Sequence, residues 1–158
     1  MNNPTSLSVE TAPKSTSCEP EASLAVLIRK PVEADVPLIY NSWARSYKHQ
    51  FKKMAFPIYK AFIEPVIADC IQHSEILVAC DPTDQDEIFG YIVVEDTIEG
   101  PVVHYVYVKS PFRRLGIATM LCQNAGVTRP VTFTHQSRHS HLYGVYLPFI
   151  TFLQTLRD

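Results

Sequence analysis

Residues 102–108 (Val-Val-His-Tyr-Val-Tyr-Val) and residues 113–118 (Arg-Arg-Leu-Gly-Ile-Ala) decide the fold of this chain. The first run is rich in β-branched and aromatic residues, which favour a buried strand in the middle of a sheet. Ser110 and Pro111 end that strand, and the residues after Gly116 are good helix formers with an apolar face. The sequence therefore predicts a strand, a basic glycine turn and a helix, in that order.

The glycine turn is suited to bind phosphate. The first backbone N–H groups of a helix lack partners within the helix and the helix dipole is positive there, so an anion is favoured. Arg113 and Arg114 add positive charge. Gly116 has no side chain that would hold a pyrophosphate away from the backbone, and Ala118 keeps the first helical turn narrow. The alternative is an ordinary strand-to-helix turn with solvated arginines.

Four residues, Val108, Arg113, Gly116 and Ala118, match the Gln/Arg-x-x-Gly-x-Gly/Ala signature of the Gcn5-related N-acetyltransferases (GNAT family) and the valine upstream of it. The chain resembles that family over about residues 24–136. The resemblance implies an α/β (α+β) single domain with a mixed, mostly antiparallel sheet flanked by helices. It also implies that the turn binds the pyrophosphate of acetyl-CoA, and that the strand before it splays from the next strand so that pantetheine can pair with its backbone. The expected cofactor-binding residues are Val106, Tyr107, Val108, Arg113, Arg114, Leu115, Gly116, Ile117 and Ala118.

Composition and net charge argue against several other classes of protein. The chain has 158 residues, of which 46% are hydrophobic, and this predicts one domain with one core. A net charge of −2 argues against a broad nucleic-acid surface. With no long apolar span and no signal-like N-terminus, we expect a cytoplasmic protein that does not enter a membrane. Reduced thiols are expected at the four widely spaced cysteines, Cys18, Cys70, Cys80 and Cys122.

The chain divides into a tail and a domain. Residues 1–22 are polar, rich in Asn, Pro, Ser and Thr, and predicted to be flexible in isolation, although they offer a route to an oligomer or larger assembly. Residues 23–158 form the predicted GNAT-like domain. Its expected elements are a strand at 24–29, a helix ending near residue 49, a helix at 58–73 kinked or broken at Pro65, a hairpin at 75–80 and 88–94, and a strand at 131–135. The part at 136–158 is shorter than the family's usual C-terminal helix and two strands.

Acetyl transfer to an amine requires a base for the amine and an acid for the leaving thiolate. Counting by two from Val108 places Val106 and His104 on one face of the strand. His104 is the predicted base, acting directly or through water, because arylalkylamine-type members of the family carry a histidine at this distance from the arginine and histidine titrates near neutral pH. The alternative is a histidine that is merely hydrogen-bonded at a strand edge. The family resemblance implies a tyrosine acid on the helix after the fifth strand, for which Tyr143 is the nearest candidate and Tyr146 the second. The residues themselves favour the alternative, which is packing with an exposed hydroxyl.

Two further groups of residues have simpler interpretations. His135, His139 and His141 could in principle meet one zinc ion, but no Cys, Asp or Glu ligand lies nearby, so we expect no metal. The second group is a basic and aromatic patch, which in the family helps to shape the acceptor pocket and is otherwise a solvated helix end. Its members are Lys48, His49, Phe51, Lys52 and Lys53.

The sequence thus favours an acetyl-CoA-dependent N-acetyltransferase whose acceptor is an amine. Small amines, antibiotics and protein lysines all remain open as acceptors. The alternative function is a catalytically silent subunit with the same fold that binds partners in a larger assembly, and the short C-terminal part and the polar tail favour it.

Overall fold

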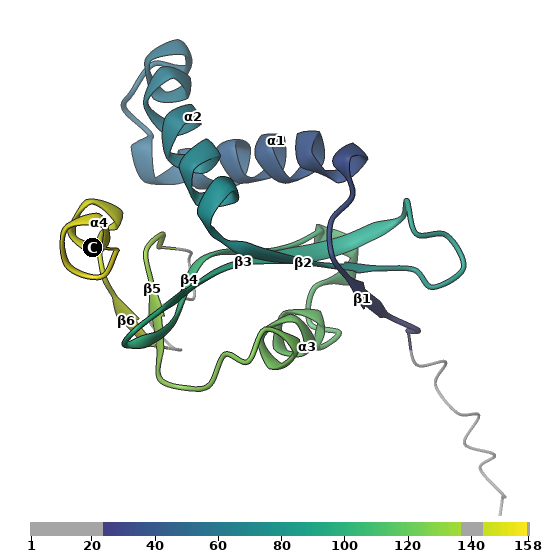
Figure 1. The fold of residues 1–158 in the computed structure, drawn as a ribbon. Coiled ribbons are helices and arrows are strands. Elements are labelled where there is room, and N and C mark those ends of the chain that lie inside the picture. The colour runs from purple at the N-terminus through teal and green to yellow at the C-terminus, as the bar shows by residue number, and fades with distance from the viewer. Residues whose placement is uncertain (1–23, 137–143, 158) are drawn as a thin grey trace, which may run out of the picture.

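The computed structural model describes residues 24–136 and 144–157, which form a sheet covered by helices on both faces (Figure 1). Six strands are ordered β1-β2-β3-β4-β5-β6, with antiparallel pairing from β1 to β4 and parallel pairing from β4 to β6. This confirms the α/β class and the mixed, mostly antiparallel sheet. The strands are β1 (Leu27–Arg29), β2 (Glu75–Cys80), β3 (Ile88–Thr97), β4 (Gly100–Val108), β5 (Val131–Phe133) and β6 (Gly144–Tyr146).

Four α-helices cover the sheet. In Figure 1, α1 and α2 lie on one face and α3 on the other, and α4 lies beside the β6 edge. Helix α2 begins with a proline in its first turn, where the missing N–H costs nothing. It continues past Pro65, so of the two expected outcomes, a kink or a break, the break does not occur. The helices are α1 (Val36–Tyr47), α2 (Phe56–His73), α3 (Ile117–Asn124) and α4 (Phe149–Thr155), and the short 3₁₀ helices are η1 (Glu33–Asp35), η2 (Lys48–Phe51) and η3 (Ser110–Phe112).

Apolar side chains form one core on each face of the sheet. Trp43 of α1 and Tyr59 of α2 pack on Tyr91 of β3 in the first core, and the α3 residues Ile117 and Leu121 pack on the sheet in the second. Strand β3 is buried over its first eight residues, so its sequence is a nearly continuous apolar run rather than an alternating one. The two cores hold β3 and β4 in the centre of the molecule, as the sequence predicts for residues 102–108.

The described residues also bear on the cysteines and on membrane crossing. Cys70 and Cys80 are buried and Cys122 is half-buried, and all three are free thiols, as predicted. Cys18 lies outside the described residues. Within the described ranges, none of the helices combines the length and apolar character needed to cross a membrane.

Candidate functional site

Strands β4 and β5 are paired over a short distance and then separate. Val102 and Val103 lie beside Thr132 and Phe133, and the Thr134 N–H donates one more hydrogen bond to the Val103 carbonyl, at 3.1 Å. Beyond this point β4 continues to pair with β3, but no described strand pairs with it on the β5 side. One backbone edge of β4 is therefore open, in the splayed arrangement that the family resemblance implies.

The turn that follows β4 has two residues with left-handed backbone conformations and free space in front of its glycine. Gly116 precedes α3 with φ of 80°, and Arg114 has φ of 66°, a left-handed value that is rare for a residue with a side chain. A Cβ atom added to Gly116 would have no neighbour within 4 Å. The Met120 N–H bonds the Gly116 carbonyl at 3.0 Å, whereas the preceding amides of the first helical turn have no backbone acceptor among the described residues. These amides form an open cradle at the start of α3.

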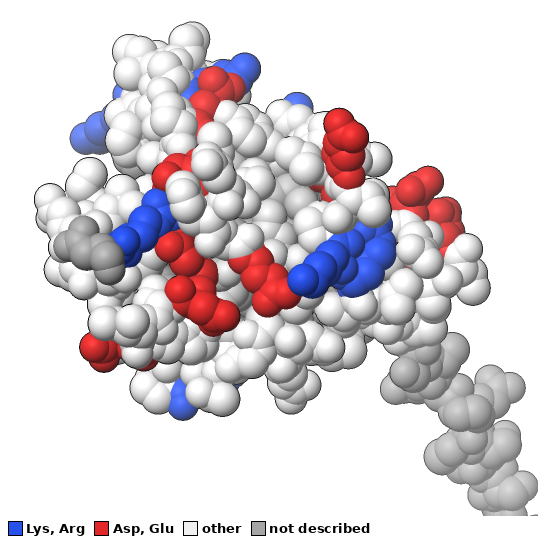
Figure 2. All heavy atoms as spheres, in the orientation of Figure 1, with Lys and Arg blue, Asp and Glu red and all other residues white. Residues whose placement is uncertain are grey.

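Positive charge near the cradle comes from two arginines. The Nε of Arg113 donates to the Val108 carbonyl at 3.0 Å and so holds its exposed guanidinium group close to the end of β4, and Arg114 is exposed beside it. Nearby Lys109 instead pairs with Glu87 at 3.2 Å. Acidic and basic side chains are interspersed on the face shown in Figure 2, and no broad basic surface occurs there. On this face, positive charge is therefore confined to small groups of residues.

The structure brings the predicted cofactor-binding residues into one continuous region. Residues 106–108 are half-buried on the open part of β4, while Leu115 and Ala118 are exposed around the turn. The side chain of Ile117 is buried in the core under α3, so this residue can present only its backbone amide to a ligand. Their role in binding acetyl-CoA remains a prediction.

A β-bulge changes the expected position of His104. Val93 lies opposite Tyr105 and Val94 opposite Val103, so His104 is an extra residue in β4 without a partner in β3. The expectation that His104 and Val106 share a face is wrong, because the extra residue breaks the period of two. Val106 packs against the core under α3, whereas the His104 ring contacts aromatic rings of α4 on the other side of the sheet.

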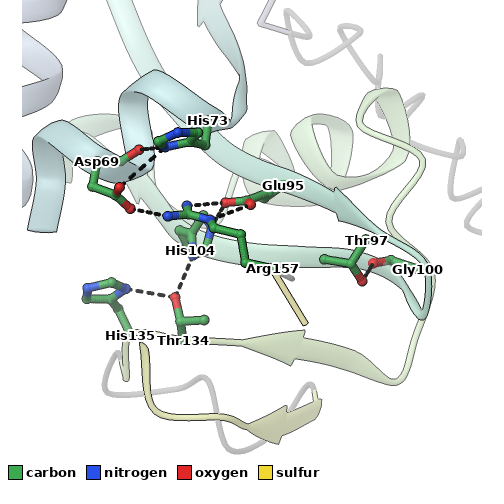
Figure 3. Close-up of polar contacts among 9 residues, drawn as sticks. All are labelled: Asp69, His73, Glu95, Thr97, Gly100, His104, Thr134, His135 and Arg157. Atoms are coloured by element: carbon green, nitrogen blue, oxygen red, sulfur yellow. Dashed lines mark hydrogen bonds and ion pairs between the residues drawn. The ribbon is translucent and has the colours of Figure 1, made fainter. Parts of the chain in front are cut away.

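The bulge places His104 inside a polar network (Figure 3). Its ring is 0% exposed, Nε2 lies 3.0 Å from Glu95 Oε2, and Nδ1 lies 2.7 Å from Thr134 Oγ1. Burial lowers the pKa of His104 more than the Glu95 carboxylate raises it. Both ring nitrogens are engaged, so in this arrangement His104 has no free nitrogen for a substrate. Its role as base is untested and remains a proposal.

Arg157, which follows α4, closes the network. Its Nε and Nη2 donate to the two carboxylate oxygens of Glu95 at 2.8 and 2.6 Å, and its Nη1 donates to Asp69 of α2. Burial alone would raise the pKa of Glu95, but the hydrogen bonds from Arg157 and His104 outweigh it and hold that pKa below its usual range. Glu95 is therefore an ionised carboxylate that can only accept hydrogen bonds.

At the opposite end of the network lies His135, just beyond β5. Its Nδ1 is 2.9 Å from Thr134 Oγ1, and its ring packs edge-on against Trp43 at 5.1 Å and Tyr47 at 4.9 Å between ring centroids. Burial lowers the pKa of His135 to about 3, with a smaller contribution from His104. The sequence by itself suggests only a metal-binding role for His135. Among the described residues no cluster could hold a metal ion, and His139 and His141 lie outside them.

The remaining candidates occupy other positions. Tyr143 lies outside the described residues, and Tyr146 is 39% exposed on β6, where its ring packs on Phe133. A shallow concavity of about 410 Å³ is lined by six residues that include most of the basic and aromatic patch: His49, Gln50, Phe51, Lys52, Lys53 and Met54. The side-chain amide of Gln50 donates to the Gln136 carbonyl at 3.0 Å, which connects this concavity to the end of β5 beside His135.

Comparison with known proteins identifies the fold. No family model and no curated protein matches the sequence. A protein from Pyrococcus furiosus provisionally assigned as an acetyl transferase is 15% identical, with a TM-score of 0.58 over 75% of this chain and 89% of that protein. The N-acetyltransferase YhbS from Escherichia coli, in complex with CoA, is 21% identical over 68% of this chain and only 57% of its own, with a TM-score of 0.46. PaiA from Thermoplasma acidophilum, in complex with coenzyme A, is 15% identical over 65% and 70%, with a TM-score of 0.47.

The sheet order, the helices on both faces and the splay between β4 and β5 therefore define the GNAT acetyltransferase fold. At these identities the comparison establishes the fold alone.

Proposed function

We propose that this protein is an acetyl-CoA-dependent N-acetyltransferase that transfers the acetyl group to an amine by direct attack. One observation carries the proposal: the open edge of β4 leads directly to the cradle of free amides at the start of α3. A cofactor with an amide-containing arm and a pyrophosphate needs both features side by side. The GNAT fold provides the same arrangement in the family that the sequence resembles.

Each part of the proposed site has a physical task. The amide groups of the pantetheine arm pair with the free backbone of Val106–Val108, as a strand would. The pyrophosphate lies on the amides of residues 116–118, where the helix dipole and the charges of Arg113 and Arg114 favour it. Bound in this way, acetyl-CoA supplies an activated thioester at the point where β4 and β5 separate. His104 contributes to removal of the amine proton, and Tyr143 is the proposed acid for the thiolate.

A second candidate function is a catalytically silent subunit that binds partners in a larger assembly. One observation favours it: His104 is fully enclosed, with both ring nitrogens hydrogen-bonded. Mass measurement and a turnover assay on the same sample distinguish the two functions. A species that releases CoA in the presence of amines supports the enzyme, and a stable, inert oligomer supports the binding subunit.

Isothermal titration with acetyl-CoA tests the cofactor claim. We expect saturable binding at one site, and we expect Arg113→Gln to weaken it about tenfold, because a hydrogen bond to a charged group contributes ~1.5 kcal/mol. The matched control is Arg45→Gln, which removes an exposed arginine from α1 on the opposite face of the sheet. Absence of binding by the folded wild-type protein would contradict the proposed function.

A further inference from the structure

The polar network around the bulge has a defined hydrogen-bond direction. The ionised Glu95 can only accept, so His104 donates to it from Nε2. Neutral His104 then accepts at Nδ1, and the Thr134 hydroxyl must donate there. Because that hydroxyl has one proton, Thr134 accepts from the Nδ1–H of His135. The chain of bonds therefore leaves the lone pair of His135 on Nε2.

The free nitrogen of His135 is at the point where the two strands diverge. Thr134 makes the last hydrogen bond between β5 and β4, and His135 is the next residue. Figure 3 shows one ring nitrogen of His135 directed at Thr134 and the other directed away from the network. Among the described residues, no side chain lies within hydrogen-bond distance of that second nitrogen, and a hydrogen bond between the ring and the His104 backbone raises the pKa of His135 without reversing the effect of burial. The proposed cofactor path along the open edge of β4 ends at this place.

The surroundings of His135 include a second unsatisfied polar group. Trp43, 0% exposed, has its indole Nε1 without a hydrogen-bond partner within the described part of the chain, and its ring packs against that of His135. A buried donor without an acceptor is costly, and such groups usually meet an ordered water or a ligand. The residue that carries this unused donor therefore contacts the His135 ring beside the end of β5. An indole N–H can only donate, so the partner that it lacks is an acceptor, such as the oxygen of an ordered water.

We propose that His135 is the base that receives the acceptor amine's proton, and that Thr134 and His104 are positioning residues that carry the charge inward to Glu95. This inference rests on the proposed N-acetyltransferase function. The amine attacks in its neutral form, and its lone pair forms a bond to the thioester carbonyl carbon. An N–H bond of the resulting adduct, which is more acidic than a free ammonium, then breaks and its proton goes to His135 Nε2. The Nδ1 proton of His135 moves to Thr134, and the Thr134 hydroxyl proton moves to His104 Nδ1. His104 then carries one positive charge beside the Glu95 carboxylate.

The remaining steps balance the reaction. Once that proton has left the nitrogen, the C–S bond breaks, and its electron pair leaves with the CoA thiolate. The thiolate is protonated by the acid of the proposed function. The proton held by His104 returns to solvent by the reverse path through Thr134 and His135, and solvent reprotonates that acid. The enclosed position of His104 is compatible with this role, because it never touches the amine.

The hydrogen-bonded path from His135 through Thr134 to His104, called the relay from here on, predicts that turnover depends on pH. Protonation of the relay before substrate binds removes the acceptor nitrogen, so kcat/KM falls as pH decreases. The groups facing the two histidines are Glu95 of β3, Asp69 of α2, Arg157 after α4, and Tyr47 and Tyr105. Glu95 favours the charged relay and Arg157 opposes it. Interrupting the chain at Thr134 should therefore change the acidic limb of the profile.

Substitutions at two threonines of the same segment test the relay. Thr134→Val removes the hydroxyl at nearly constant volume, and Thr132→Val makes the same change two residues earlier, outside the network. We expect Thr134→Val to lower kcat about tenfold or more and to shift the acidic limb, with KM for acetyl-CoA unchanged. Thr134→Ser should restore most of kcat, and His135→Gln should lower kcat about 100-fold. Wild-type kcat and pH profile in Thr134→Val would overturn the relay.

Nitrogen NMR of the imidazole rings provides a readout independent of turnover. We expect His135 to be protonated at Nδ1 and His104 at Nε2 in the wild-type protein. His135 protonated at Nε2 would overturn the proposal, because no lone pair would then be available to the amine. Acetyl-CoA titration of each variant separates failure of the N-acetyltransferase function from failure of the relay. Absence of binding by the wild-type protein would contradict the N-acetyltransferase function. Intact binding together with unchanged turnover in His135→Gln would contradict the relay alone.

Discussion

Gly116→Val should abolish detectable acetyl-CoA binding, with a loss of at least about 100-fold in affinity, equivalent to ~2.7 kcal/mol. Two effects combine at this position. A β-branched residue is strained at φ of 80°, and its side chain would project into the empty space in front of the first amides of α3. That space is where the proposed pyrophosphate lies. Isothermal titration of the folded variant measures the effect.

The other end of α3 offers a matched control. Gly126 also has a left-handed backbone, with φ of 66°, and a Cβ there would likewise meet nothing within 4 Å. Gly126→Val therefore imposes a similar backbone strain of roughly 1–3 kcal/mol but leaves the cradle untouched. We expect both variants to unfold at lower urea concentration and only Gly116→Val to lose binding. Equal binding by the two variants would show that acetyl-CoA does not lie on the start of α3.

Much of the fold is predictable because its signals are local. The apolar run at 102–108, the breakers Ser110 and Pro111, and the glycine before α3 act within a few residues, and the structure confirms the strand, turn and helix that they predict. The hairpin of β2 and β3 is equally local. At Pro65 the local rule allows a kink or a break, and packing of α2 against the sheet keeps the helix continuous. Tertiary contacts there outweigh the local preference.

The site is less predictable because its key contacts join distant segments. A one-residue bulge in β4 leaves little trace in the sequence, yet it turns His104 away from the face that period two predicts. Arg157 meets Glu95 across 62 positions of the chain, and Thr134 meets His104 across 30. His135 was visible only as one of three closely spaced histidines. The signal that could have singled it out is its position directly after β5, opposite the bulged strand.

These distant contacts converge on the place where β4 and β5 separate. The bulge supplies His104 from β4, Thr134 and His135 follow β5, and Arg157 fixes Glu95 from the C-terminal segment. The short C-terminal part therefore does more than cover the sheet, because it holds the charge at the inner end of the network. Removal of that charge has the largest expected effect on stability.

Arg157→Ala should lower the free energy of unfolding by about 2–3 kcal/mol at neutral pH. The side chain is 18% exposed, so we place the effect below that of a fully buried ion pair. The variant leaves the Glu95 carboxylate, whose side chain is 9% exposed, without its strongest donor. Urea unfolding measures the loss, and Lys60→Ala, which removes an exposed partner of Glu64 on α2, should change stability by less than about 0.5 kcal/mol.

The pH dependence of this loss identifies its cause. The pKa of Glu95 is lower in the folded protein than in the unfolded chain, so its ionised form contributes stability above the usual glutamate pKa, and that contribution disappears as pH falls through the lowered value. The difference between wild type and Arg157→Ala should therefore shrink in acid, because a protonated Glu95 no longer requires the guanidinium group. Adding Glu95→Gln to Arg157→Ala should recover part of the loss at neutral pH. A difference that stays constant from neutral to acidic pH would show instead that Arg157 stabilises α4 mainly through its packing on Phe149 and Phe152.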